Sequence, residues 1–303
     1  MLEITEKFVR IFNNLIEKIK NRRSQIVLNL HSMLKAGIIG GFGILTVSSV
    51  LETKMKEYDT VPLKPIDTIS IIMSSLNEGL LIGTALSSIR NQSIIQQYPE
   101  YFELILADSC STDGTTELAE PYVDRIIIAP RGKLTARNIA TNEAKGNIIV
   151  SVDSDTYYPF HYLNTLLKPF NDYTNSKYEN VIGTFGSTFD YTIPYIPGKL
   201  FSFGDSFYNT FFSRNRMTGR NSAFWKHAFY LAERFNENIN QLNMWDVFFE
   251  EEYRFGNRLS KLGKIIYNIN ASCYHLGGMK SMGRLGIGDK KFRNENKFGE
   301  DRF

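Results

Sequence analysis

The feature that most constrains the fold of this chain is a regular alternation of short apolar runs with helical stretches, which begins at residue 66. Strands and helices that alternate in this way are typical of βαβ units and a mostly parallel sheet with helices on its faces. With 43% hydrophobic residues, the chain can build a large core. We therefore predict an α/β fold, with strands over 68–74, 103–108, 125–130 and 147–153 and helices over 78–91 and 133–146, the latter ended by Gly146.

Cysteine content and charge distribution exclude several classes of protein. The two cysteines, Cys110 and Cys273, are far apart and show no paired spacing of a zinc or redox site. They point to a reducing compartment, so a cytoplasmic protein is predicted. Residues 1–65 carry 10 Lys and Arg against 6 Asp and Glu, and residues 279–303 carry 7 against 4. Because the basic residues belong to the two ends rather than to the body, no nucleic-acid partner is expected.

The N-terminal region reads as a helical leader. Residues 2–34 have the spacing of a basic amphipathic helix, and residues 36–51 form an uncharged run that contains four glycines. A membrane span needs about 20 apolar residues, so this run is slightly short. Three arrangements stay open: a short membrane span, a helix lying in the membrane interface, or a segment packed on the folded domain that follows. A polar linker over 52–65 follows, and membrane association is predicted to depend on residues 1–51.

Polar side chains follow the predicted strands at the point where each strand ends. In open α/β sheets, ligands bind beyond the carboxyl ends of the strands. Asp153 and Asp155 lie two residues apart after an apolar strand, and two such carboxylates can converge on a divalent cation. The sequence therefore predicts a binding crevice at this edge, and a metal within it.

Four motifs in order resemble those of the family 2 glycosyltransferases, which have the Rossmann-like GT-A fold. They are SIIMSSLNEG, LILADSCSTDGTTE, GKLTARNIATNEAKGNIIVSVDSD and EEYRFGNRLSKLG, and the resemblance covers roughly residues 66–280. The chain departs from the family pattern at Ser74, Leu76, Ser109 and Cys110, where the family has Pro, Tyr, Asp and Gly. The tyrosine that the family has at position 76 would stack on the nucleotide base, and Leu76 has no ring to do so. The predicted organisation is a leader over 1–65, a GT-A domain over 66–280 and a basic tail over 281–303.

The resemblance implies roles for individual residues. Ser74, Ser75 and Leu76 would line the base, Glu78 the nucleoside, and Asp108 would accept a hydrogen bond from the base. Arg137 would lie close to the donor, although it could instead simply pair with a carboxylate. The remaining expected roles are Asp155 as a metal ligand, Asp153 on the metal or the ribose, His275 as a further metal ligand, Lys280 and Arg284 as a diphosphate clamp, Asn221 beside the acceptor, and Glu252 as catalytic base with Glu251 as its alternative.

The expected activity is that of an inverting glycosyltransferase that depends on Mn²⁺ or Mg²⁺. It would use a nucleotide-diphospho-sugar donor, linked to UDP, and a hydroxyl of a sugar, lipid or protein as acceptor. The alternative is a membrane-tethered, glycosyltransferase-like binding module that has lost turnover. Because the Asp-X-Asp motif and the acidic run 250–252 are both present, the enzyme is the favoured hypothesis.

Overall fold

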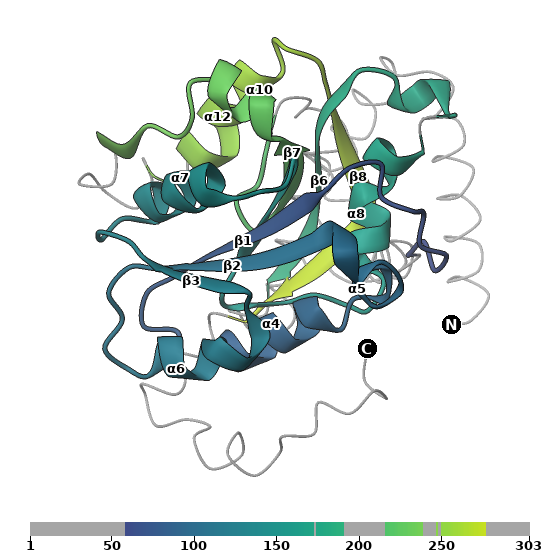
Figure 1. Ribbon diagram of the computed structural model, residues 1–303. Coiled ribbons are helices and arrows are strands. Elements are labelled where there is room, and N and C mark those ends of the chain that lie inside the picture. The colour runs from purple at the N-terminus through teal and green to yellow at the C-terminus, as the bar shows by residue number, and fades with distance from the viewer. Residues whose placement is uncertain (1–57, 173, 191–215, 239–246, 248–249, 277–303) are drawn as a thin grey trace, which may run out of the picture.

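A computed structural model of the chain describes residues 58–172, 174–190, 216–238, 247 and 250–276. Within these residues, eight strands form one sheet in the order β3-β2-β1-β4-β7-β6-β8-β5 (Figure 1). The strands are β1 (Ile69–Ser75), β2 (Phe102–Asp108), β3 (Arg125–Ile128), β4 (Ile148–Asp153), β5 (Thr156–Tyr157), β6 (Val181–Asp190), β7 (Asn221–Trp225) and β8 (Lys264–His275).

Helices cover both faces of this sheet. In Figure 1, α7, α10 and α12 lie above the sheet, whereas α4 and α6 lie below it. The longer helices are α4 (Ile82–Arg90), α7 (Lys133–Glu143) and α8 (Tyr162–Asn171); the shorter ones are α5 (Ser93–Gln97), α6 (Thr115–Ala119), α10 (Lys226–Leu231) and α12 (Phe255–Leu259). Single turns of 3₁₀-helix occupy Pro99–Tyr101, Glu120–Tyr122 and Ser176–Tyr178, and η5 (Glu250–Arg254) is a turn of π-helix.

The core consists of two apolar layers, one on each face of the sheet. Strand β1 is buried along its whole length, and its side chains alternate between the layers. Ile71 and Met73 pack with helices α4 and α8, whereas Ile72 packs with Leu134 and Ala136 of α7. Because both faces are covered, strands β1 and β4 are almost continuously apolar, as expected for the parallel part of an α/β sheet.

The first four long strands confirm the predicted parallel arrangement. Strand β1 pairs in parallel with β2 and with β4, and β2 pairs in parallel with β3. Beyond β4 the sheet becomes mixed, because β7 is antiparallel to both β4 and β6, while β6 and β8 are parallel. The fold is therefore the predicted α/β architecture with a mixed second half.

Gly146 has a different role from the one predicted. Helix α7 ends at Glu143, before this glycine is reached. Gly146 instead lies against β1, where a Cβ atom would come within 2.5 Å of the Ser70 nitrogen, and its own N–H donates to Ser70 Oγ at 2.7 Å. Close approach of two backbones, rather than helix termination, requires the glycine here.

The end of the predicted linker packs on the folded body. Tyr58 Oη lies 2.6 Å from Ser272 Oγ on β8, and burial raises the pKa of this phenol well above its ordinary value. The Asp59 carboxylate pairs with Lys168 of α8 at 2.7 Å. The folded body therefore includes residues that precede the predicted boundary at 66.

Residues 1–57 of the predicted leader and residues 277–303, which include the whole predicted tail, lie outside the described residues. The apolar run 36–51, Lys280 and Arg284 belong to these parts. Among the residues that the structure describes, no helix combines the length and the apolar content needed to cross a membrane.

Candidate functional site

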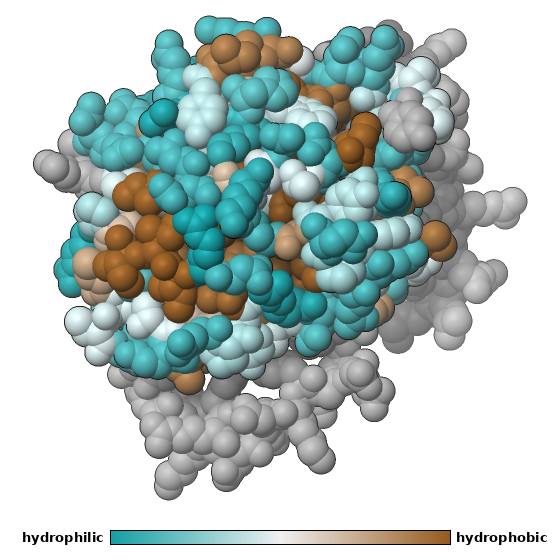
Figure 2. All heavy atoms as spheres, in the orientation of Figure 1, coloured by the Kyte–Doolittle hydropathy of each residue, from teal (hydrophilic) through white to brown (hydrophobic). Residues whose placement is uncertain are grey.

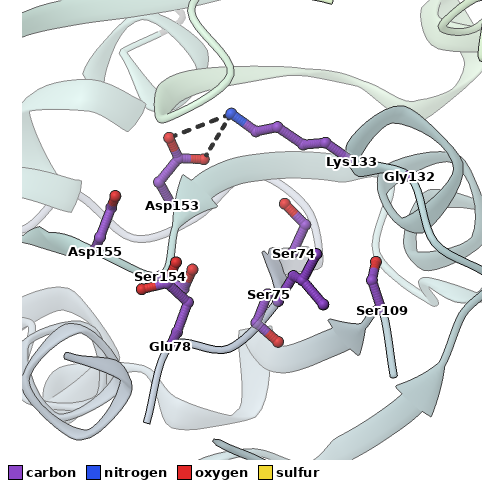
Figure 3. A pocket seen from close by; sticks show the side chains of 10 residues that line it. Ser74, Ser75, Glu78, Ser109, Gly132, Lys133, Asp153, Ser154 and Asp155 are labelled. Atoms are coloured by element: carbon purple, nitrogen blue, oxygen red, sulfur yellow. Dashed lines mark hydrogen bonds and ion pairs between the residues drawn. The ribbon is translucent and has the colours of Figure 1, made fainter. Parts of the chain in front are cut away.

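A pocket of about 290 Å³ opens at the carboxyl ends of β1 and β4, where the sequence predicts a binding crevice. This volume lies near the lower end of ligand sites, roughly 300–1,000 Å³. Figure 3 shows side chains from β1, from the start of α7 and from the end of β4 facing the same space. The lining residues are Ser74, Ser75, Leu76, Glu78, Ser109, Gly132, Lys133, Asp153, Ser154 and Asp155.

Six residues predicted for donor or metal binding line this pocket: Ser74, Ser75, Leu76, Glu78, Asp153 and Asp155. Parallel pairing explains why they meet. Ser74 of β1 is in register with Asp153 of β4, so residues almost 80 positions apart in the sequence end on the same edge. Their placement agrees with a binding role.

Asp153 is surrounded by cations. Arg137 forms an ion pair with its carboxylate, Lys133 Nζ lies 3.4 Å from Oδ1, and Arg220 Nε lies 3.6 Å from Oδ2. Burial alone would raise the pKa of Asp153, but Lys133, Arg137 and Arg220 outweigh it and hold the pKa well below its ordinary value. Asp153 is therefore an ionised residue whose charge is already balanced by protein cations.

Arg137 does not reach the pocket wall. Its guanidinium, only 1% exposed, joins Asp153 to the buried carboxylate of Glu251 on η5. Gly219 makes room for this ion pair, since a Cβ atom there would overlap both Arg137 and Glu251. The structure thus favours the alternative in which Arg137 pairs with carboxylates, and it makes Glu251 a partner of Arg137 and Lys133.

Asp155 and His275 approach each other at the rim of the pocket, with His275 Nε2 3.1 Å from Asp155 Oδ2. They come from distant parts of the chain, and the antiparallel pairing of β5 with β8 brings them together, assisted by a hydrogen bond from Leu276 N to the Asp155 carbonyl. Burial would raise the pKa of Asp155, but the hydrogen bond and charge of His275 dominate and lower it.

This pair fits a divalent metal. A carboxylate oxygen and an imidazole nitrogen are suitable ligands for a metal such as Mn²⁺. Among the described residues, no group of three or more His, Cys, Asp or Glu side chains is placed to hold an ion. The protein would then supply two ligands, Asp155 and His275, and phosphate oxygens and water would complete the shell, as they commonly do for Mg²⁺.

Asp108 lies behind the pocket and not in its wall. Its Oδ1 accepts hydrogen bonds from Ser75 Oγ at 2.7 Å and Ser111 Oγ at 2.5 Å, and its Oδ2 accepts one from Ser111 N at 2.7 Å. The carboxylate therefore fixes the Ser75 hydroxyl, which does line the pocket. In this structure Asp108 supports the predicted base-binding edge through Ser75.

Asn221 contradicts the acceptor-side prediction. It is completely buried at the start of β7, and its amide nitrogen donates to the carbonyls of Ser187 and Ala271, while Tyr162 Oη donates to its Oδ1. With no exposed surface and with its amide bonded to the protein, Asn221 stabilises the sheet and cannot contact an acceptor. Its neighbour Arg220 is the residue that reaches the pocket side, toward Asp153.

Lys133 and Arg220 are the functional candidates that sequence reasoning missed. Lys133 follows Gly132 at the start of α7, within one of the four family motifs. Arg220 immediately precedes Asn221, which was predicted beside the acceptor. Together with Arg137 they place three cations beside Asp153, Asp155 and Glu251. The protein charges of the site are therefore nearly balanced, so that a bound divalent cation would leave it positive and suited to a diphosphate.

The remaining predicted residues are described only in part or not at all. Glu252 follows Glu251 on η5, and its side chain lies outside the described part of the structure. Lys280 and Arg284 lie beyond the last described residue, 276. Their predicted roles as base and diphosphate clamp stay predictions.

Comparison with known proteins agrees with this architecture. The sequence profile described as Glycosyl transferase family 2 matches residues 70–249. Over 96 residues, the chain is 31% identical to the poly(ribitol-phosphate) beta-N-acetylglucosaminyltransferase TarS of Staphylococcus aureus strain Mu50. That match covers 29% of this chain and only 16% of TarS, so the two proteins share a segment and not their whole length.

Solved structures share the fold. The mannosyltransferase PcManGT of Pyrobaculum calidifontis, solved with GDP-Man and Mn²⁺, matches with a TM-score of 0.51 and 19% identity over 82% of this chain and 68% of that one. GalNAc-T7, solved with UDP, GalNAc and Mn²⁺, matches with a TM-score of 0.50 and 15% identity over 72% of this chain and 44% of that one. At these identities the likeness concerns the fold alone.

Proposed function

Since this chain belongs to glycosyl transferase family 2, we propose that it transfers a sugar from a nucleotide-diphospho-sugar to an acceptor hydroxyl, with inversion at the anomeric carbon. The observation that carries this proposal is the pocket that brings Ser74, Ser75, Glu78 and Asp153 together beside the Asp155–His275 pair. A nucleoside would lie along the end of β1, and the diphosphate would face Asp155. The two structural neighbours, solved with GDP-Man or UDP and Mn²⁺, support a ligand of this class.

We assign a divalent cation, Mn²⁺ or Mg²⁺, to Asp155 and His275. Bound there, the cation would supply electrostatic stabilisation of the charge that develops on the leaving diphosphate. Asp153 is less suited to be a direct ligand, because Lys133, Arg137 and Arg220 already neutralise it. Its proposed role is to hold these cations beside the donor.

The proposed reaction is a direct displacement. The acceptor oxygen forms a bond to the anomeric carbon as the bond from that carbon to the diphosphate oxygen breaks, and the electron pair leaves with the nucleoside diphosphate. Glu252 takes the acceptor proton as general base. Its neighbour Glu251 is buried against Arg137, which suits a positioning role and leaves Glu252 as the proposed base.

We propose UDP as the nucleotide. The base-binding edge offers serine hydroxyls from Ser74, Ser75 and Ser109, and the Asp108 carboxylate holds the Ser75 hydroxyl in place. A hydroxyl that donates to Asp108 keeps its lone pairs for an N–H of the base. Uracil presents one such group, and because guanine does so as well, the donor screen compares UDP-linked with GDP-linked sugars. The proposed acceptor is a hydroxyl of a sugar, a lipid or a protein. We also propose that residues 1–51 bring the enzyme to a membrane surface.

A donor screen tests the proposed function. The full chain would be incubated with UDP-, GDP- and ADP-linked sugars, and release of nucleoside diphosphate would be measured with Mn²⁺, with Mg²⁺ and with a chelator. Release from a UDP-linked sugar that requires the metal is the expected result. A chain that releases no nucleoside diphosphate from any donor, yet binds UDP, would match the inactive binding module instead.

A further inference from the structure

Lys133 differs from the other cations around Asp153 in its exposure and its freedom to move. Its side chain is 38% exposed and forms part of the pocket wall, whereas the side chains of Arg220 and Arg137 are 25% and 1% exposed. Figure 3 shows its ammonium group reaching over the cavity to Asp153, on the side opposite Ser75 and Glu78. A flexible four-carbon side chain allows this group to turn without moving the backbone of α7.

The contacts that Lys133 makes are duplicated by Arg137. Lys133 Nζ lies 3.1 Å from Glu251 Oε2 and 3.4 Å from Asp153 Oδ1, so it bridges the same two carboxylates that Arg137 joins in the interior. If the ammonium group moved away, each carboxylate would still keep its buried guanidinium partner. The fold does not depend on Lys133 remaining between the two acids.

Binding of the ligands assigned above would change the charges that Lys133 meets. A divalent cation at Asp155 would repel the ammonium group, since Asp155 lies only two residues beyond Asp153. A diphosphate in the same pocket would bring negative oxygens to the side that Lys133 faces. Charge-assisted hydrogen bonds between an ammonium and phosphate oxygens are among the stronger polar contacts in proteins.

We propose that Lys133 is an exchangeable cation of the donor pocket. Its ammonium group bridges Asp153 and Glu251 in the position that the structure gives it, and it turns to donate to the diphosphate when a donor binds. This inference rests on the proposed function, because it needs a diphosphate in the pocket. It adds to the site a donor-contacting residue that the sequence motifs did not identify.

Titration calorimetry of the full chain with UDP in the presence of Mn²⁺ tests the inference. Lys133→Met removes the charge but keeps most of the length, and we expect it to weaken UDP binding about 10- to 100-fold, the range for losing a hydrogen bond to a charged group. Lys133→Arg, which keeps a positive charge, should retain most of the affinity. Lys261→Met, at an exposed lysine that does not line the pocket, is the matched control and should bind as the wild type does.

A second titration, with Mn²⁺ alone and detected by electron paramagnetic resonance, separates this role from a structural one. An exchangeable cation competes with the metal, so Lys133→Met should bind Mn²⁺ at least as tightly as the wild type while it loses UDP affinity. A parallel fall in Mn²⁺ affinity, UDP affinity and melting temperature would mean that Lys133 is a structural ion pair, and the inference would be wrong.

Unchanged UDP affinity in Lys133→Met would also overturn the inference while leaving the proposed function intact. Failure of the wild-type chain to bind UDP or GDP with Mn²⁺ would instead refute the proposed donor class, and the inference with it. The wild-type titration therefore tests the function, and the comparison of variants tests the role of Lys133.

Discussion

Replacing Arg137 with methionine removes the buried guanidinium that joins Asp153 to Glu251. Removing one partner of a buried ion pair costs about 3–5 kcal/mol, because the other charge is left without compensation. Here Lys133 stays 3.1 Å from Glu251, and Arg220 stays 3.6 Å from Asp153, so part of the loss is offset. We therefore expect Arg137→Met to lower the free energy of unfolding by about 3 kcal/mol, the lower end of that range.

Urea unfolding followed by tryptophan fluorescence measures this loss. Arg125→Met is the matched control, because Arg125 pairs with Glu143 at 2.9 Å on the surface, where an ion pair contributes about 0–1 kcal/mol. Adding Glu251→Gln to Arg137→Met removes one of the two carboxylate charges that lose their buried guanidinium partner, and it should recover part of the stability. If Arg137→Met lowers the free energy of unfolding no more than Arg125→Met does, the buried ion pairs of Arg137 do not hold the site together.

Three further predictions concern catalysis, pH and the N-terminal region. Glu252→Gln should keep donor binding and reduce the rate of transfer by about 10²-fold or more, the scale of general-base catalysis. If Glu251→Gln is inactive and Glu252→Gln is active, the general base is Glu251 instead. The folded-state pKa of Asp153 lies below its ordinary value of 3.8, so its ionisation stabilises the fold above that pH, and this contribution is lost as the pH falls through the lowered value. Stability should therefore fall less steeply with decreasing pH in Asp153→Asn than in the wild type. The same acid dependence of stability in both proteins would contradict this role of Asp153. A chain that starts at Lys56 keeps Tyr58 and should retain its thermal transition but lose co-sedimentation with anionic vesicles, whereas aggregation on truncation would favour a leader packed on the domain.

Local sequence patterns were sufficient for the first half of the sheet. Strands β1, β2 and β4 are short apolar runs flanked by helical segments, and such alternation leaves few arrangements other than a parallel sheet. Because parallel strands end at one edge, Ser74, Asp153 and Asp155 could be assigned to one crevice before their contacts were known. The family resemblance predicted Asp155 and His275 as metal ligands, and the β5–β8 pairing is the physical reason why the two side chains meet.

The second half of the sheet and the cation cluster could not be predicted in this way. Strand β6 pairs in parallel with β8 across some 80 residues, with bulges that no local pattern encodes. Lys133 and Arg220 contribute by bringing their cationic groups to Asp153, which depends on side-chain direction and not on motif spacing. The acceptor-side prediction for Asn221 was wrong for a similar reason, because its place in the sequence does not show that its amide is buried and bonded to the carbonyls of Ser187 and Ala271.

The electron spin-echo spectrum of Mn²⁺ bound to the full chain together with UDP tests most directly whether the pocket is a metal-assisted donor site. We expect ³¹P coupling from the diphosphate and ¹⁴N coupling from the His275 imidazole, with His275→Gln losing the ¹⁴N coupling and Asp155→Ala losing Mn²⁺ binding altogether. A spectrum without ³¹P coupling, or one that neither substitution changes, would contradict the placement of the metal and the donor in this pocket.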